Sequence, residues 1–167
     1  LSRPDTFTDF HTADIAPYRV GDSRLALAPV RFVGLADGGT HVSTIALLDG
    51  RFPDGMVRGL RVPVEGRFGG RGGLRIGEGC VDARFATLQY GALRLGPTRL
   101  PLCPVGGGAI LTQAPGGSLR IGAGTRNLRL AGTLGKSPFG LAAARARLAG
   151  DRAVEAAVAA SARLAPA

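Results

Sequence analysis

The sequence predicts an all-β fold, a long antiparallel meander of short strands with little or no helix except at the C-terminus. The first observation is a recurring triplet in which an arginine stands between two aliphatic residues. Because successive side chains of a strand point to opposite faces, each triplet places its aliphatic groups on one face and its arginine on the other. The copies are Leu60-Arg61-Val62, Leu74-Arg75-Ile76, Leu93-Arg94-Leu95, Leu119-Arg120-Ile121 and Leu128-Arg129-Leu130.

The second observation is the number of residues that favour turns. The 167 residues include 27 glycines and 11 prolines, many of which separate the alternating segments. Aliphatic residues are too plentiful for a disordered chain, so the glycines indicate tight turns between strands. The third observation is the scarcity of aromatic residues, with seven Phe, two Tyr and no Trp. This composition favours a smooth aliphatic face over the interlocked core of a sandwich.

The chain divides into two regions that differ in their residue pattern. Residues 1–17 are expected to be an irregular N-terminal segment, and residues 18–167 a single elongated, curled sheet domain excerpted from a longer chain. Four residues of the N-terminal segment are potential metal ligands by type: Asp5, Asp9, His11 and Asp14. Their spacing matches no standard metal motif, so a loop or a peripheral strand is the better interpretation.

Within the sheet domain, the first alternating segment runs through Leu25 and Leu27 and is ended or bent at Pro29. Turn signals follow at Asp37-Gly38-Gly39, Asp49-Gly50 and Pro53-Asp54-Gly55. Further strands with short connections are expected at residues 41–48, 57–64, 74–77, 80–90, 92–96, 98–103, 108–113, 118–122, 126–134 and 138–148.

The alanine-rich segment 141–165 is compatible with two structures. Alanine favours an amphipathic helix, and Val154, Val158 and Ala162 fit a helical stripe. The alternation of period two nevertheless continues through the segment, and we favour strands for this reason. The side chains expected to share one face are Ala142, Ala144, Ala146 and Leu148.

The formal net charge is +9, and arginine carries nearly all of the positive charge because Lys136 is the only lysine. A basic chain can attract anionic membranes or nucleic acid. The arginines are scattered instead of clustered, so we interpret them as a solvated face. They alternate with Leu and Ile, and the aromatic stacking groups of a nucleic-acid-binding surface are missing. We therefore expect no nucleic-acid partner.

No catalytic motif is recognisable. Gly135-Lys136-Ser137 resembles the end of a phosphate-binding loop, but Leu130 stands where that motif requires glycine. Neither His11 nor His41 has a partner at catalytic or metal-binding spacing, and most carboxylates stand in turns, which explains them without catalysis. We expect a protein that is not an enzyme, with no cofactor and no metal site.

Targeting signals and cysteines leave the compartment open. No apolar run reaches the roughly 18 residues that span a bilayer, and no signal peptide is visible. For an excerpt, neither absence identifies a compartment. The two cysteines, Cys80 and Cys103, permit either a disulfide or two buried thiols.

The apolar face of such a sheet can be covered by a second sheet, by a partner protein or by lipid. Each acyl CH₂ transferred from water contributes about 0.8 kcal/mol, so about 15 of them provide on the order of 10 kcal/mol. We expect a sheet curled into an open groove, lined by one phase of each strand. The candidate lining residues are Leu25, Leu27, Leu60, Val62, Val64, Leu74, Ile76, Leu93, Leu95, Leu100, Leu102, Leu119, Ile121, Leu128 and Leu130.

Two segments carry a resemblance to a known family. They are Gly79-Cys80-Val81-Asp82-Ala83 and Leu93-Arg94-Leu95-Gly96-Pro97-Thr98-Arg99-Leu100-Pro101-Leu102-Cys103-Pro104. With weaker likeness in Leu48 to Arg51 and Gly59 to Val64, they resemble the YdbH-type intermembrane phospholipid transport family, an AsmA-like branch of the bridge-like lipid transfer proteins. The likeness covers about residues 40–150.

The resemblance implies a fragment of a Gram-negative periplasmic protein that is anchored in the inner membrane by a part outside this sequence. It implies a β-taco-like curled sheet whose β-groove conducts phospholipid toward the outer membrane, and it allows an outer-membrane partner protein. An oxidising periplasm favours a disulfide between Cys80 and Cys103. The alternative is a structural or scaffold β-domain, with a closed packed core, from a secreted or outer-membrane-associated protein.

Overall fold

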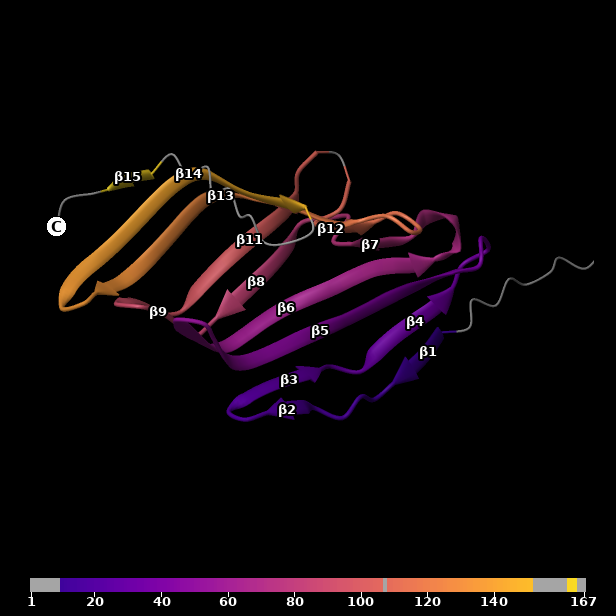
Figure 1. The fold of residues 1–167 in the computed structure, drawn as a ribbon, viewed down its shortest axis with the longest axis horizontal. Helices are drawn as coiled ribbons and strands as arrows, with labels where there is room; N and C mark the ends of the chain where they lie inside the picture. Colours follow the sequence, from indigo (N-terminus) through magenta and orange to yellow (C-terminus); the bar gives the residue numbers. More distant parts are fainter. Residues whose placement is uncertain (1–9, 107, 152–161, 165–167) are drawn as a thin grey trace, which may run out of the picture.

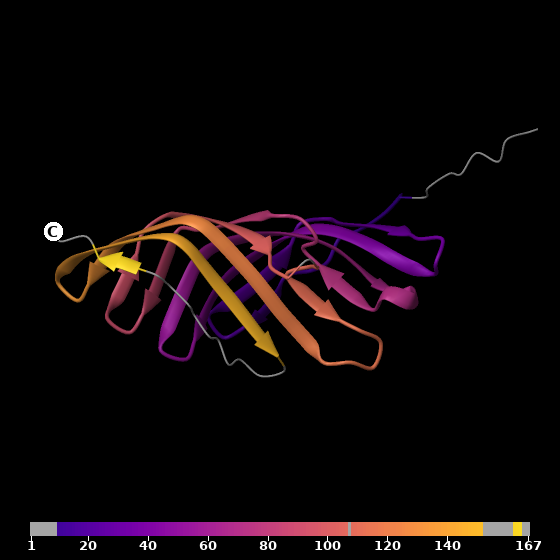
Figure 2. The same ribbon diagram turned by 90° about the horizontal axis from the view of Figure 1, so that it is seen from above.

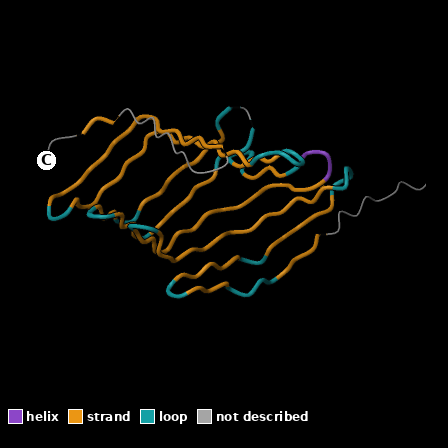
Figure 3. Tube along the Cα trace, in the orientation of Figure 1, coloured by secondary structure: helices purple, strands orange, loops and turns teal. Residues whose placement is uncertain are grey.

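The computed structural model describes residues 10–106, 108–151 and 162–164, and in these ranges the chain forms one antiparallel sheet (Figure 1). The all-β prediction is confirmed, since the described ranges contain no helix except a short 3₁₀ turn at Gly70–Gly72 (Figure 3). The strands are β1 (Phe10–Ala13), β2 (Tyr18–Val20), β3 (Ser23–Leu27), β4 (Val30–Gly34), β5 (Gly39–Phe52), β6 (Gly55–Gly69), β7 (Leu74–Ile76), β8 (Val81–Phe85), β9 (Thr87–Tyr90), β10 (Leu93–Leu95), β11 (Thr98–Pro104), β12 (Leu111–Gln113), β13 (Leu119–Leu134), β14 (Ser137–Asp151) and β15 (Ala162–Leu164).

The chain crosses the sheet back and forth in long lines, some of which are broken into shorter strands. Four of these lines form two long hairpins, β5–β6 and β13–β14. Between them, β7, β8 and β9 follow one another along β6, and β10, β11 and β12 follow one another along β13. The pairs β7–β12, β8–β11 and β9–β10 therefore connect the two long hairpins at three places.

Several predicted boundaries differ from those observed. The predicted strands 118–122 and 126–134 form the single strand β13, and the predicted strand 80–90 is divided into β8 and β9. Part of the segment predicted to be irregular, Phe10–Ala13, pairs with β4 as an edge strand, whereas residues 1–9 lie outside the described residues. The predicted turn at Asp49-Gly50 is wrong, because both residues lie within β5.

The alanine-rich segment is a strand wherever it is described before residue 152, because β14 pairs with β13 along its whole length. Residues 162–164 pair with β14 as β15, and residues 152–161 lie outside the described residues. One detail of the predicted alternation is wrong: Ala143 is buried, whereas Ala142 and Ala144 are exposed.

The reason is a change of alternation phase that recurs from strand line to strand line. Residues that share a face are normally two apart in the sequence, but the pairing register shows a spacing of three at one point in each of six lines. Strand β5, by contrast, alternates without such a step. The residue pairs are Leu27/Val30, Val57/Leu60, Phe85/Leu88, Leu95/Thr98, Thr125/Leu128 and Ala143/Ala146. We call this row the phase-change line.

Local backbone features account for individual steps of the phase-change line. Gly59 has φ +62° and Asn127 has φ +55°, values that glycine and asparagine tolerate best. The backbone N–H of Gly59 donates to Oδ1 of Asp49 at 2.6 Å, which stabilises the bulge in β6. Pro29 and Pro97 interrupt two further lines. Bulges bend strands and increase twist, and Figure 2 shows β13 and β14 bending across the curved sheet.

Candidate functional site

The pairing register assigns each side chain to one of the two faces of the sheet, because directly opposed residues of neighbouring strands share a face. Leu25, Leu48 and Leu60 form one such row, and Leu27, Ala46 and Val62 form the next. Ile76, Leu111 and Ile121 continue the same face across β7, β12 and β13. When the register is followed from strand to strand, with the spacing of three at the phase-change line taken into account, all fifteen candidate lining residues lie on this face. We call it the apolar face.

Most of the candidate lining residues are only partly buried. Leu95 is buried, with 4% of its surface exposed, whereas Leu25, Leu119 and Ile121 expose 40%, 37% and 38%. The other eleven have intermediate exposure. Among the described residues, no large side chain is completely buried. A sheet face that the protein covered by itself would be expected to contain completely buried aliphatic side chains.

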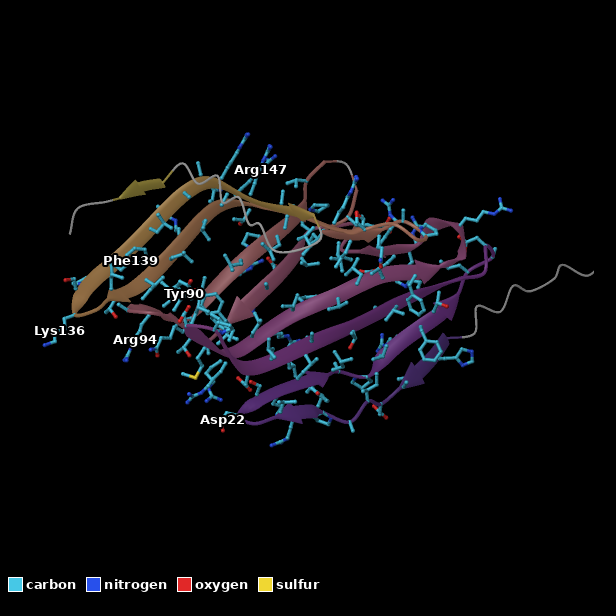
Figure 4. The ribbon with its side chains drawn as sticks, in the orientation of Figure 1. Asp22, Tyr90, Arg94, Lys136, Phe139 and Arg147 are labelled. Carbon is cyan, nitrogen blue, oxygen red and sulfur yellow. A yellow bond between two sulfur atoms is a disulfide. The ribbon has the colours of Figure 1, made fainter. Side chains whose placement is uncertain are left out.

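A small packed cluster lies where the phase-change line crosses the middle of the sheet. Val57, Phe85 and Leu95 are buried there. Partly buried neighbours from β5 to β14 pack around them: Leu48, Leu60, Leu88, Leu93, Leu100, Leu130 and Phe139. Since the described strands form one sheet, these side chains bury one another. Figure 4 labels Phe139, one of the residues of this cluster.

Sequence reasoning missed Val57 and Phe85 as members of the apolar face. Val57 is out of phase with Leu60, Val62 and Val64 if β6 alternates without interruption. The signal that could have placed it is Gly59, since a glycine inside an alternating segment often indicates a bulge. The change of phase between Phe85 and Leu88 has no such glycine, because the residue between β8 and β9 is Ala86.

The opposite face carries the arginines, and we call it the arginine face. All five arginines of the recurring triplet belong to it, including Arg61, which lies directly opposite Arg84. Arg84 in turn lies opposite Arg99, and Arg67 lies opposite Arg75. Described acidic residues such as Asp49, Glu65 and Asp82 also stand on this face but are outnumbered by the arginines, so the face is basic.

Two carboxylates relieve part of the repulsion between these arginines. Oε1 of Glu78 accepts hydrogen bonds from Nη2 of Arg67 at 3.0 Å and from Nε of Arg75 at 2.8 Å. Burial by itself would raise the pKa of Glu78, but the bonds and charges of Arg67 and Arg75 outweigh it and lower this pKa below its ordinary value. A hydrogen bond from Arg99 likewise lowers the pKa of Asp82, and it raises the pKa of Arg99.

The two cysteines also lie on the arginine face. Cys80 and Cys103 form a disulfide with sulfur atoms 2.08 Å apart and Cα atoms 4.0 Å apart. Leu102 of β11 pairs with Val81, the first residue of β8, so Cys103 of β11 stands opposite Cys80, which immediately precedes β8. The disulfide is the pair that the family resemblance implies. It links the line of β7, β8 and β9 to the line of β10, β11 and β12 in the middle of the sheet.

Reactive groups are sparse in the part of the chain that the structure describes. There, no three His, Cys, Asp or Glu side chains lie close enough to share a metal ion. Nε2 of His41 lies 3.3 Å from Oε1 of Glu65, a pair that stands on the arginine face. No helix in the described ranges is long and apolar enough to cross a bilayer.

The fold and its faces define a single-layer, one-sided β-sheet protein. No protein-family model, curated protein or solved structure matches this chain.

Proposed function

We propose that this chain is a non-enzymatic segment of an intermembrane phospholipid-transport protein, in which the apolar face forms a groove that shields acyl chains from water. The observation that carries the proposal is the partial exposure of this face. Fifteen aliphatic side chains lie on one face of one sheet, and all but Leu95 retain exposed surface. Exposed apolar area of this extent favours an interaction partner.

Hydrocarbon suits this face better than a packed protein surface does. The face is aliphatic and poor in aromatic residues, so it offers few deep pockets that would hold a partner in one register. An acyl chain of about 15 CH₂ groups gains on the order of 10 kcal/mol by leaving water. The headgroups remain in solvent, and the acyl chains lie in the groove. Movement along the groove is passive, since no residue has to change its chemical state.

The phase-change line gives the proposed groove its direction. It crosses successive strands, which are spaced about 4.8 Å apart, instead of following one strand. In this proposal the cluster of Val57, Phe85 and Leu95, which lies along the phase-change line, forms the floor of the groove. The half-exposed residues toward the strand ends, such as Leu119 and Ile121, then form the walls.

The location and partners belong to the same proposal. A periplasmic segment, anchored in the inner membrane through other parts of the protein, would work in an oxidising compartment. The disulfide between Cys80 and Cys103 is compatible with such a compartment. The partners would be phospholipid and, through parts outside this sequence, the inner and outer membranes, with the YdbH-type proteins as the family that the sequence resembles.

A structural β-domain with a closed core is the second candidate, and one observation favours it. The cluster around Phe85 shows that part of the apolar face is covered by the chain itself. If a partner protein covered the rest, the face would be an interface and would not bind lipid.

Photocrosslinking distinguishes these candidates. A benzophenone side chain at position 121 would lie on the apolar face, and the same group at the neighbouring position 120 would lie on the arginine face. After incubation with phospholipid vesicles and illumination, we expect lipid adducts at position 121 and few at position 120, measured by mass spectrometry of the intact protein. Equal labelling at both positions, or labelling at neither, would contradict the proposal.

A further inference from the structure

The pairing of β13 with β14 gathers three arginines on the arginine face. Arg126 lies directly opposite Arg145, and Arg147 lies opposite Gly124 on the same pair of strands. All three arginines are exposed. Directly opposed like charges destabilise a sheet, so this arrangement is unfavourable unless something neutralises it.

A hollow lies beside these arginines. Its volume is about 110 Å³, enough for several water molecules, and it is lined by Arg126, Arg145 and Arg147 together with Cys103, Val105 and Gly124. Gly124 keeps the space open, since a Cβ atom there would lie 3.0 Å from Cγ1 of Val105 and 3.9 Å from Cγ of Arg147. In Figure 4, Arg147 extends outward from β14.

None of the described residues that line the hollow is acidic. In the described ranges, the arginines that form ion pairs are Arg51, Arg67, Arg75 and Arg99. The three arginines at the hollow thus differ from Arg67 and Arg75, which stand directly opposite each other but share Glu78 as a counter-charge. At the hollow, a ligand can take the place that Glu78 occupies in the other pair.

We propose that this hollow binds a phosphate group. Guanidinium groups recognise phosphate through paired, charge-assisted hydrogen bonds, and three of them match a group that carries up to two negative charges. The phosphate comes either from a lipid headgroup or from a soluble phosphate compound. The site lies on the face opposite the apolar face, so it does not depend on the proposed binding of acyl chains.

Calorimetric titration of the chain with inorganic phosphate, at constant ionic strength maintained with chloride, tests the site. We expect saturable binding that becomes about tenfold weaker in Arg145→Gln, because at least one charge-assisted hydrogen bond is lost. The matched control is Arg129→Gln, which removes an arginine from the same face of β13, opposite Ala142 and away from the hollow. This control should bind phosphate as the unchanged chain does.

Folding of the variants is checked independently. Without phosphate, Arg145→Gln should be at least as stable as the unchanged chain, because it removes one member of an opposed like-charge pair. Equal phosphate affinity in both variants, or no saturable binding by the unchanged chain, would overturn the proposal.

A second measurement identifies the source of the phosphate. Vesicles of phosphatidylcholine with phosphatidic acid are floated with the unchanged chain and with Arg145→Gln. Flotation that is reduced in Arg145→Gln supports a lipid headgroup as the natural source. Flotation that is equal in both, together with weakened binding of inorganic phosphate, supports a soluble phosphate compound.

Discussion

The exposure of the apolar face predicts that equal truncations on it have very different effects on stability. Leu95→Ala removes a side chain that is 4% exposed and packs with Val57 and Phe85. Truncation of a buried leucine leaves a cavity and destabilises by about 3 kcal/mol. Ile121→Ala removes a side chain that is 38% exposed, and the smaller loss of burial corresponds to about 1 kcal/mol.

Urea denaturation followed by circular dichroism measures both values. We expect the unfolding midpoint of Leu95→Ala to fall about three times as far as that of Ile121→Ala, with similar slopes for both. Leu119→Ala, at a second half-exposed position, should resemble Ile121→Ala. A cost for Ile121→Ala equal to that for Leu95→Ala would show that the chain itself seals the apolar face, and the groove proposal would fail.

Four further outcomes follow from individual contacts. Gly132→Ala should destabilise severely, because a Cβ atom there would overlap the carbonyl oxygen of Arg94, whereas Gly140→Ala, where nothing lies within 4 Å, should have little effect in thermal denaturation. Thr125→Val should raise the free energy of unfolding by about 1 kcal/mol, since the Thr125 hydroxyl is buried without a hydrogen-bond partner in the described ranges; a loss of stability would refute this reading. Reduction of the disulfide, which separates its cysteines by 23 positions, should cost roughly 3 kcal/mol, and an unchanged urea midpoint under reducing conditions would contradict this. The pKa of Glu78 is lowered from its ordinary value of 4.5, so its ionised carboxylate contributes to the free energy of unfolding above pH 4.5, and this contribution is lost as the pH falls through the lowered pKa. Glu78→Gln should therefore flatten the acid side of the profile of stability against pH. An unchanged profile would argue against the pairing of Glu78 with Arg67 and Arg75.

Local alternation was sufficient to predict much of the candidate site. In Leu74-Arg75-Ile76 and Leu93-Arg94-Leu95, the aliphatic and basic side chains take the faces that the triplet predicts. The turn at Asp37-Gly38-Gly39 also forms as predicted, with the N–H of Gly39 donating to Oδ1 of Asp37 at 3.0 Å. Each of these features depends on residues that are close together in the sequence.

Features that depend on how the strands register with one another were not predicted. Val57 and Phe85 join the buried cluster only because the phase changes near Gly59 and Ala86. Ala143 is buried in place of Ala142 and Ala144 for the same reason. Asp49 has the sequence context of a turn residue, but in the structure its carboxylate binds the bulge in the neighbouring strand.

The sequence by itself determined that this protein is a sheet with one aliphatic face and one basic face, because alternation with period two is a local property of an extended chain. Only the tertiary structure decided which aliphatic side chains are buried and which remain exposed. It also decided which arginines oppose one another, as Arg126 and Arg145 do. These outcomes depend on register, which is set by pairing between distant segments, and a single-residue step in any strand exchanges its faces.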